Sequence, residues 1–177
     1  MIFWVDEIKE VVDMMRATVP IVGDTDAPYY LHGHPIDVMN QMQQRDKHDE
    51  YKFKQWPLIA LFQDFDESYG DNSLAASEVS LNIIIATVTS KDFTGAQRYD
   101  ASFRPTLQPL YELFISKLIA SGKFMKLTSS VPHTKTDRLY WGTESGAGNT
   151  ANKFPDYIDA IEISDLNLKL RKISKCK

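Results

Sequence analysis

The segments QWPLIALFQDF (residues 55–65) and SEVSLNIIIATVT (residues 77–89) decide the fold, because both have the composition of β-strands. Each is rich in β-branched and aromatic residues, which favour a pleated, half-buried surface. The connecting segment DESYGDNSLAA (residues 66–76) is polar and carries Gly and Asn turn signals. The two segments are therefore predicted to pair as an antiparallel hairpin.

The second of these strands is apolar on both faces in its second half. Its odd positions, Val79 to Ile85, are apolar throughout, whereas its even positions begin polar, at Glu78 to Asn82, and then become apolar. The apolar even positions are Ile84, Ala86 and Val88. An antiparallel strand with one face in water stays polar on that face. We therefore expect a cover over these three residues, either a helix of the same chain or another chain, and they are candidate subunit-interface residues.

Three further segments have helical patterns. Residues 5–19 repeat apolar positions at three- and four-residue steps and end at Pro20. Residues 36–50 form a shorter, mostly polar helix. The longest apolar stripe predicts a regular helix at 106–121, with AQRYDASF (96–103) as a preceding turn or short helix. This long helix is the expected cover for one face of the sheet.

The C-terminal part is predicted to return to β-structure, with an exposed strand or hairpin in 127–142 and a closing strand in 156–172. The closing strand changes phase, because Ile161 and Ile163 are odd whereas Leu166 to Leu170 are even, and a bulge near Ser164 or Asp165 reconciles the two halves. The fold class that follows is α+β. A mostly antiparallel sheet packs against one long helix, with an N-terminal helix, in a single domain over 1–177.

Two loops, at about 20–35 and 142–156, are expected to be mobile, because they are dense in Gly, Pro, Asp and other polar residues. The second contains further interface candidates: Ser145, Gly146, Gly148 and Asn149. Long polar loops in a compact domain are often functional and can order on a partner. We expect this loop to contact an adjacent copy or another protein.

The net charge of −4 is unevenly distributed along the chain. Residues 1–90 carry 6 basic and 15 acidic side chains, a net of −9, and residues 91–177 carry 14 and 9, a net of +5. This split indicates either two differently solvated faces or a surface that pairs head-to-tail with a copy of itself. No apolar run reaches the ~18 residues needed to cross a bilayer, no signal peptide is expected, and a single cysteine, Cys176, fits a reducing cytoplasm.

The sequence contains few candidates for catalysis. His32 and His34, with Asp37 nearby, have side chains that bind zinc, but a hydrogen-bonded or solvated role is more usual for such a pair in a loop. The glycines of GTESGAGN (residues 142–149) lack the Gly-Lys-Ser/Thr ending of a phosphate-binding loop. The final KLRKISKCK (residues 169–177) carries five basic groups, and contact with DNA phosphates is left open. No catalytic residue, metal site or cofactor is predicted.

The combination of PLIALFQDF (57–65), LNIIIATVT (81–89) and QRYDASFRPTLQPLYELF (97–114) resembles virion proteins of tailed bacteriophages, in particular the crAss-like phages. The order of helix, hairpin, helix and closing strands is also similar to the tail-terminator, tail-completion and head–tail connector class. The resemblance covers roughly residues 29–124 and the closing strand.

The resemblance implies a non-enzymatic ring subunit of the virion neck, assembled in the cytoplasm of the host bacterium, with closure by six or twelve copies. Its expected partners are copies of itself and neighbouring neck, portal or tail proteins, with DNA passing non-specifically through the lumen and no membrane contact. Two alternatives remain open. One is a small metal-dependent hydrolase or nuclease that uses His32 and His34, and the other is a cytoplasmic phage adaptor or regulatory binding protein.

Overall fold

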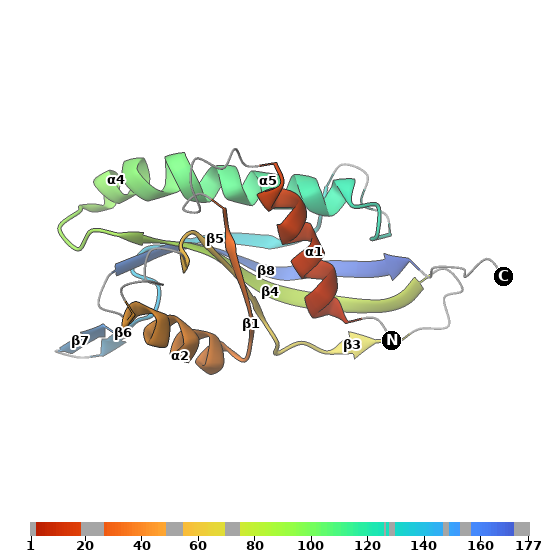
Figure 1. Ribbon diagram of the computed structural model, residues 1–177, viewed down its shortest axis with the longest axis horizontal. Helices are drawn as coiled ribbons and strands as arrows, with labels where there is room; N and C mark the ends of the chain where they lie inside the picture. Colours follow the sequence, from red (N-terminus) through yellow and green to blue (C-terminus); the bar gives the residue numbers. More distant parts are fainter. Residues whose placement is uncertain are drawn as a thin grey trace.

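The computed structural model describes residues 3–18, 27–48, 55–69, 75–125, 127, 130–146, 149–152 and 157–171. The fold is α+β, as predicted: a mostly antiparallel sheet lies between helices on its two faces (Figure 1). The elements in chain order are α1 (Trp4–Arg16), β1 (Tyr29–Gly33), α2 (Pro35–Asp46), β2 (Leu58–Phe62), β3 (Glu67–Ser68), β4 (Ala75–Thr89), α4 (Gly95–Arg98), η2 (Tyr99–Leu107), α5 (Gln108–Ala120), β5 (Thr134–Arg138), β6 (Thr143–Gly146), β7 (Asn149–Asn152) and β8 (Tyr157–Arg171).

The main sheet has six strands in the order β1-β2-β4-β8-β5, with β3 paired to β4. The predicted hairpin is confirmed, since β2 and β4 are antiparallel and Ala60 lies opposite Ile84. The two longest strands, β4 and β8, pair along most of their length and form the centre of the sheet. The β1–β2 pair is parallel.

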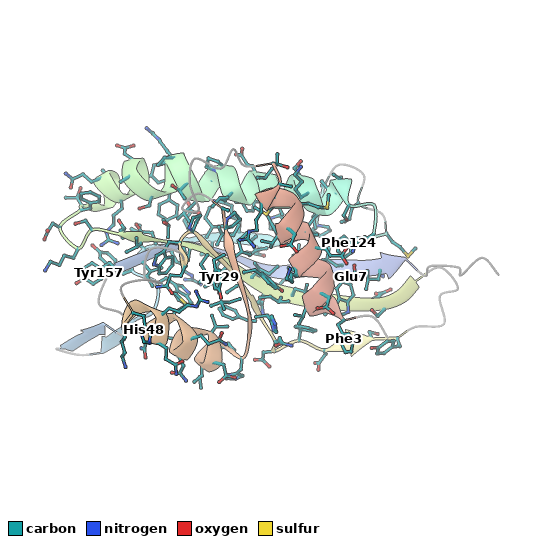
Figure 2. All side chains as sticks on the ribbon, in the orientation of Figure 1. Phe3, Glu7, Tyr29, His48, Phe124 and Tyr157 are labelled. Carbon is teal, nitrogen blue, oxygen red and sulfur yellow. The ribbon has the colours of Figure 1, made fainter. Side chains whose placement is uncertain are left out.

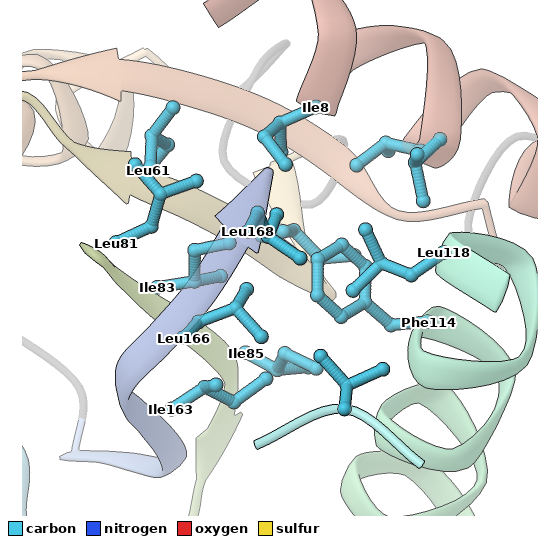
Figure 3. Close-up of a cluster of buried hydrophobic side chains, with 14 of the residues drawn as sticks. Ile8, Leu61, Leu81, Ile83, Ile85, Phe114, Leu118, Ile163, Leu166 and Leu168 are labelled. Carbon is cyan, nitrogen blue, oxygen red and sulfur yellow. The ribbon is translucent and has the colours of Figure 1, made fainter. Parts of the chain in front are cut away.

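One face of the sheet packs against α1 and α5. Ile8 of α1 and Phe114 and Leu118 of α5 approach the side chains of β4 and β8 (Figure 3). The sheet residues in this cluster include Leu61, Leu81, Ile83, Ile85, Ile163, Leu166 and Leu168. All are buried, so the odd face of β4 lies in the main core as its pattern predicts.

The opposite face of the sheet is covered by α2 of the same chain. Val38 and Met42 of α2 form a second buried cluster with Ile84 and Ala86, both of which have no exposed surface. Ile84 and Ala86 are therefore withdrawn as subunit-interface candidates. Their side chains are already buried by their own chain and offer no surface to a neighbour. Val88, at the end of β4, is 38% exposed and remains a candidate.

The regular helix predicted at 106–121 is confirmed as α5, and the preceding turn or short helix expected over 96–103 is continuous with it through α4 and η2. The long helix begins with a capping box in which Thr94 accepts from the Gln97 backbone and Gln97 accepts from the Thr94 backbone. Its middle section is a π-helix that contains Pro105. Because proline has no backbone N–H and obstructs the preceding turn, the wider π-helical spacing allows the helix to pass through it.

The predicted bulge in β8 is confirmed. Leu81 pairs with Leu166 and Ile83 with Ile163, so Ser164 and Asp165 together lie opposite the single residue between Leu81 and Ile83. Asp165 adopts a left-handed conformation, with φ of 54°. The extra residue brings the odd-numbered isoleucines and even-numbered leucines of β8 onto the same core face.

Both predicted loops contain strands. In the first, residues 29–33 form β1, and residues 20–26 lie outside the described part. In the second, β6 and β7 form a hairpin, which replaces the expected irregular loop over their residues. Among the described residues, no helix is both long and apolar enough to span a membrane.

Candidate functional site

The β6–β7 hairpin, called the arm below, projects from the end of the molecule where β8 begins (Figure 1). Its two strands form a separate sheet, with Thr143 opposite Asn152 and Gly146 opposite Asn149. In the described part of the chain, its extensive contacts are those between its own two strands. The backbone of Ser145, Gly146 and Asn149 therefore lies in the arm, whereas Gly148 lies outside the described residues.

The base of the arm is built around a buried ion pair. The Nη1 atom of Arg98 on α4 lies 2.8 Å from Oδ1 of Asp159 on β8, and both side chains are fully buried. The guanidinium also donates from Nη2 to the Ser90 carbonyl at 3.1 Å and from Nε to the Phe93 carbonyl at 3.3 Å. Arg98 thus ties the start of the long helix to β8 and to the turn that follows β4.

Two tyrosines pack around the guanidinium of Arg98. Its central carbon lies 3.6 Å from the ring centroid of Tyr140 and 5.3 Å from that of Tyr157. The two rings meet edge to face, with centroids 5.2 Å apart. Figure 2 shows Tyr157 at the end of the molecule where α4 begins. A cation held over aromatic faces away from water is favourable, so this stack fixes the turn before the arm and the start of β8 after it.

The turn between β5 and the arm has a defined backbone conformation. Tyr140 has φ of 55° and Gly142 has φ of 81°, both in the left-handed region, and the Trp141 N–H donates to the Ile158 carbonyl at 2.8 Å. A tyrosine in this conformation is uncommon, and its position on Arg98 holds it there. The direction in which the chain enters the arm is therefore set by packing.

The Arg98–Asp159 pair has no access to a substrate, because both side chains are completely covered. The second carboxylate oxygen of Asp159, Oδ2, is buried and has no hydrogen-bond partner in the described part of the chain. Leaving such an atom unpaired opposes folding. The Arg98–Asp159 pair therefore has a structural role, which is to position the base of the arm.

Apolar side chains are exposed around this end of the sheet. They are Val88 (38%), Tyr99 (48%), Leu139 (45%) and Tyr140 (38%). Val88 lies opposite Ile158, whose carbonyl bonds the turn before the arm, and Leu139 lies beside Gly95 of α4. Single exposed apolar residues are common on protein surfaces. Their position at the base of a projecting hairpin is consistent with a contact surface.

The two candidate metal ligands have separate structural roles. The Nδ1 atom of His34 accepts from the Ile36 backbone at 3.3 Å and caps α2. The Nδ1–H of His32 donates to Oε1 of Gln63 at 3.0 Å. No group of three or more His, Cys, Asp or Glu side chains among the described residues is arranged to hold a metal.

A polar groove of ≈ 420 Å³ lies beside His32, at the end of β1 and along α2. Its lining residues are His32, Gly33, Asp37, Asn40, Gln41, Gln44 and Gln63. Four of them carry amide side chains, which donate and accept hydrogen bonds without charge. The groove therefore offers hydrogen-bond donors and acceptors to a polar ligand, beside the Asp37 carboxylate.

A second histidine site joins α5 to the segment before β5. Tyr111 donates through its hydroxyl to Nε2 of His133 at 2.7 Å, and Nδ1–H of His133 donates to the Val131 carbonyl at 2.7 Å. Burial raises the pKa of Tyr111 and Glu112 adds to this, although the positive charge of Lys135 opposes it. These hydrogen bonds link α5 to the segment before β5.

Comparison with known proteins found no matching family model, and a search of curated proteins found no match.

Proposed function

We propose that this chain is a non-enzymatic structural subunit of a tailed-bacteriophage virion, which forms an oligomeric ring at the head–tail junction. The observation that supports this most directly is the arm. An isolated two-stranded hairpin is marginally stable in water, so an additional strand from a partner would stabilise the arm. Its base is nevertheless rigidly fixed by Arg98, Asp159 and Tyr140, which is the arrangement expected of an element that binds another subunit.

A ring requires two different contact patches on each subunit. The arm and the exposed apolar residues at its base provide one patch at one end of the sheet. The net charges of −9 in residues 1–90 and +5 in residues 91–177 favour contact between unlike regions of neighbouring copies. Such charges act mainly on register and encounter rate, whereas desolvated apolar contacts give lasting affinity.

The phage setting rests on the resemblance of residues 57–65, 81–89 and 97–114 to tailed-phage virion proteins. In that setting the ring contacts portal, neck or tail proteins and lets DNA pass non-specifically through its centre. A cofactor has no part in this function.

The proposal is tested by measuring the particle mass of the purified protein in solution and by imaging the virion neck. A closed ring of six or twelve copies, weakened as salt rises above about 0.1 M, is the expected result. Deletion of residues 145–149 is expected to leave thermal unfolding of the monomer unchanged and to reduce the ring fraction. Glu112→Ala, an exposed change on α5 outside the proposed contact surfaces, serves as a control. A protein that stays monomeric at high concentration and low salt, and is absent from purified virions, overturns the proposal.

A further inference from the structure

The outer edge of β1 is unpaired among the residues that the structure describes. The Tyr29 N–H donates to the Pro57 carbonyl at 2.8 Å, and the Gln63 N–H donates to the Gly33 carbonyl at 2.9 Å. In a parallel pair, alternate residues bond to the neighbouring strand, so the odd-numbered residues of β1 face β2. Tyr30 and His32 therefore direct their backbone N–H and C=O groups away from β2. Among the described residues, no strand pairs with this side of β1.

The two edges of the main sheet differ in how they are protected. Natural proteins often place charged residues or proline on an exposed edge strand to prevent unwanted pairing. The β5 edge carries Lys135, Asp137 and Arg138, and the two cations pair with Asp137 and Glu162. The β1 edge, YYLHG, contains no Asp, Glu, Lys, Arg or proline. Of the two, β1 is the strand available for pairing with another chain.

The polar groove lies at the end of β1, next to this edge. It runs from His32 and Gln63 to Asn40, Gln41 and Gln44 on α2. An extended segment that pairs with β1 would place its side chains next to these amides. In strand addition, backbone hydrogen bonds provide affinity and neighbouring side-chain pockets provide specificity.

We propose that the open edge of β1, with this groove, receives the arm of a second copy of the chain. This inference rests on the proposed ring function and names its contact. The arm strands, TESG and NTAN, have four residues each and β1 has five, so the lengths match. Their sequence is dominated by small polar residues, which suit an amide-lined groove. The arm gains the third strand that a stable sheet needs.

The contact joins unlike surfaces and is therefore heterologous. Each copy offers an arm at one end and a β1 edge elsewhere, which allows every copy in a closed ring to use both surfaces.

The first test is a pair of substitutions at one position. His32→Pro removes an outward N–H and places the proline ring on the open edge, whereas the β1–β2 hydrogen bonds are retained. His32→Ala removes the side chain but keeps the N–H. We expect His32→Pro to weaken association about tenfold or more and His32→Ala to change it far less, because only the former removes a backbone donor. Equal association of both variants with the unmodified protein overturns the inference.

A second variant tests the same contact without changing β1, in case the His32→Pro protein misfolds. Gln41 is an exposed residue on α2 that lines the groove. Gln41→Trp fills the groove without altering β1, and we expect it to reduce association while the circular dichroism spectrum and melting temperature are unchanged. Unchanged association of a folded Gln41→Trp protein counts against the groove.

Disulfide trapping identifies the occupant. In a Cys176→Ser background, Ser145→Cys and Asn40→Cys proteins are prepared separately and mixed under oxidising conditions. A mixed disulfide dimer is the expected product, and the double variant is expected to form a ladder of covalent oligomers. Dimers of Ser145→Cys alone indicate arm-to-arm contact and overturn the inference. The arm-to-β1 contact is refuted if the His32→Pro and Gln41→Trp proteins still form rings and no mixed disulfide dimer appears. The proposed ring function is unaffected by that result. Absence of any oligomer in the unmodified protein refutes both.

Discussion

Arg98 and Asp159 are 61 positions apart in the sequence, yet their side chains form a 2.8 Å ion pair that is completely buried. The pair joins the first turn of the long helix to the strand that follows the arm. Tyr140, immediately before the arm, packs on the same guanidinium. Preorganisation of this kind reduces the entropy lost when a projecting element binds a partner. In the described part of the chain the arm makes its extensive contacts only between its own two strands, so the fixed base and the arm have complementary roles.

Removing one member of this pair is predicted to destabilise the fold strongly. Arg98→Met leaves the Asp159 carboxylate buried without its cation, which typically costs about 3–5 kcal/mol. Urea unfolding followed by circular dichroism measures the change. Arg104→Met provides a matched control on the same helix, because the Arg104–Asp100 pair is exposed and such pairs contribute about 0–1 kcal/mol.

The double variant Arg98→Met with Asp159→Leu is expected to recover much of this loss, since two apolar side chains leave no buried charge. If Arg98→Met and Arg104→Met have the same effect, the pair does not hold the base of the arm.

The bulge in β8 predicts opposite effects for two substitutions at Asp165. Its φ of 54° lies in the left-handed region, which costs roughly 1–2 kcal/mol for an L-residue and nothing for glycine. Asp165→Gly is expected to preserve or raise the urea midpoint, and Asp165→Val to lower it because a β-branched side chain resists this conformation. Similar midpoints for both variants would show that the bulge relaxes.

The bulge could be predicted from sequence because it follows from a local rule. Side chains alternate along a strand, so a change from odd to even apolar positions between Ile163 and Leu166 requires one extra residue if both halves face one core. The β2–β4 hairpin and the long helix were predictable for the same reason. In each of these elements the spacing of the apolar residues along the element itself indicates a strand or a helix.

The features that the sequence did not reveal depend on distant parts of the chain. The pattern at Ile84 and Ala86 required a cover, but the same pattern results whether that cover is α2 or another subunit. β1 is five residues long and pairs in parallel, so no hairpin turn indicates its partner. Arg98 and Asp159 were missed because charged residues are rarely fully buried unless paired, and the sequence does not indicate a pair 61 residues apart.

Stability is predicted to fall at alkaline pH because of two groups near α1. Burial, helped by the negative charge of Asp6, raises the pKa of Tyr30, whose hydroxyl donates to the Val5 carbonyl. Burial lowers the pKa of Lys123, but hydrogen bonds and charge from Glu10 and Glu7 outweigh this and raise it overall. Both groups keep their proton in the folded state at pH values where the unfolded chain loses it.

Both raised pKa values make the folded state less stable as the pH rises. The stabilisation is fully present below the unfolded pKa values of about 10 for Tyr and 10.4 for Lys, and it is lost as pH rises through the higher folded values. Urea midpoints measured between about pH 8 and 12 are expected to decline above pH 10. Tyr30→Phe should have a shallower decline, despite losing one hydrogen bond at pH 8. An unchanged slope in Tyr30→Phe would assign the decline to other groups.

The last prediction separates core from surface on a single strand. Ile84 and Val88 lie on the same side of β4, but Ile84 is fully buried under α2 whereas Val88 is 38% exposed near the base of the arm. Ile84→Asp places a charge in an apolar cluster without a partner and is expected to unfold the monomer, because burying an uncompensated carboxylate is very unfavourable. Val88→Asp is expected to leave the circular dichroism spectrum and melting temperature near those of the unmodified protein, and to weaken association, because its charge must be desolvated only when a neighbour covers it.

Sedimentation and thermal unfolding of the two variants give the comparison. A folded Ile84→Asp monomer contradicts the second core beneath α2, and normal association of Val88→Asp removes this end of β4 from the contact surface.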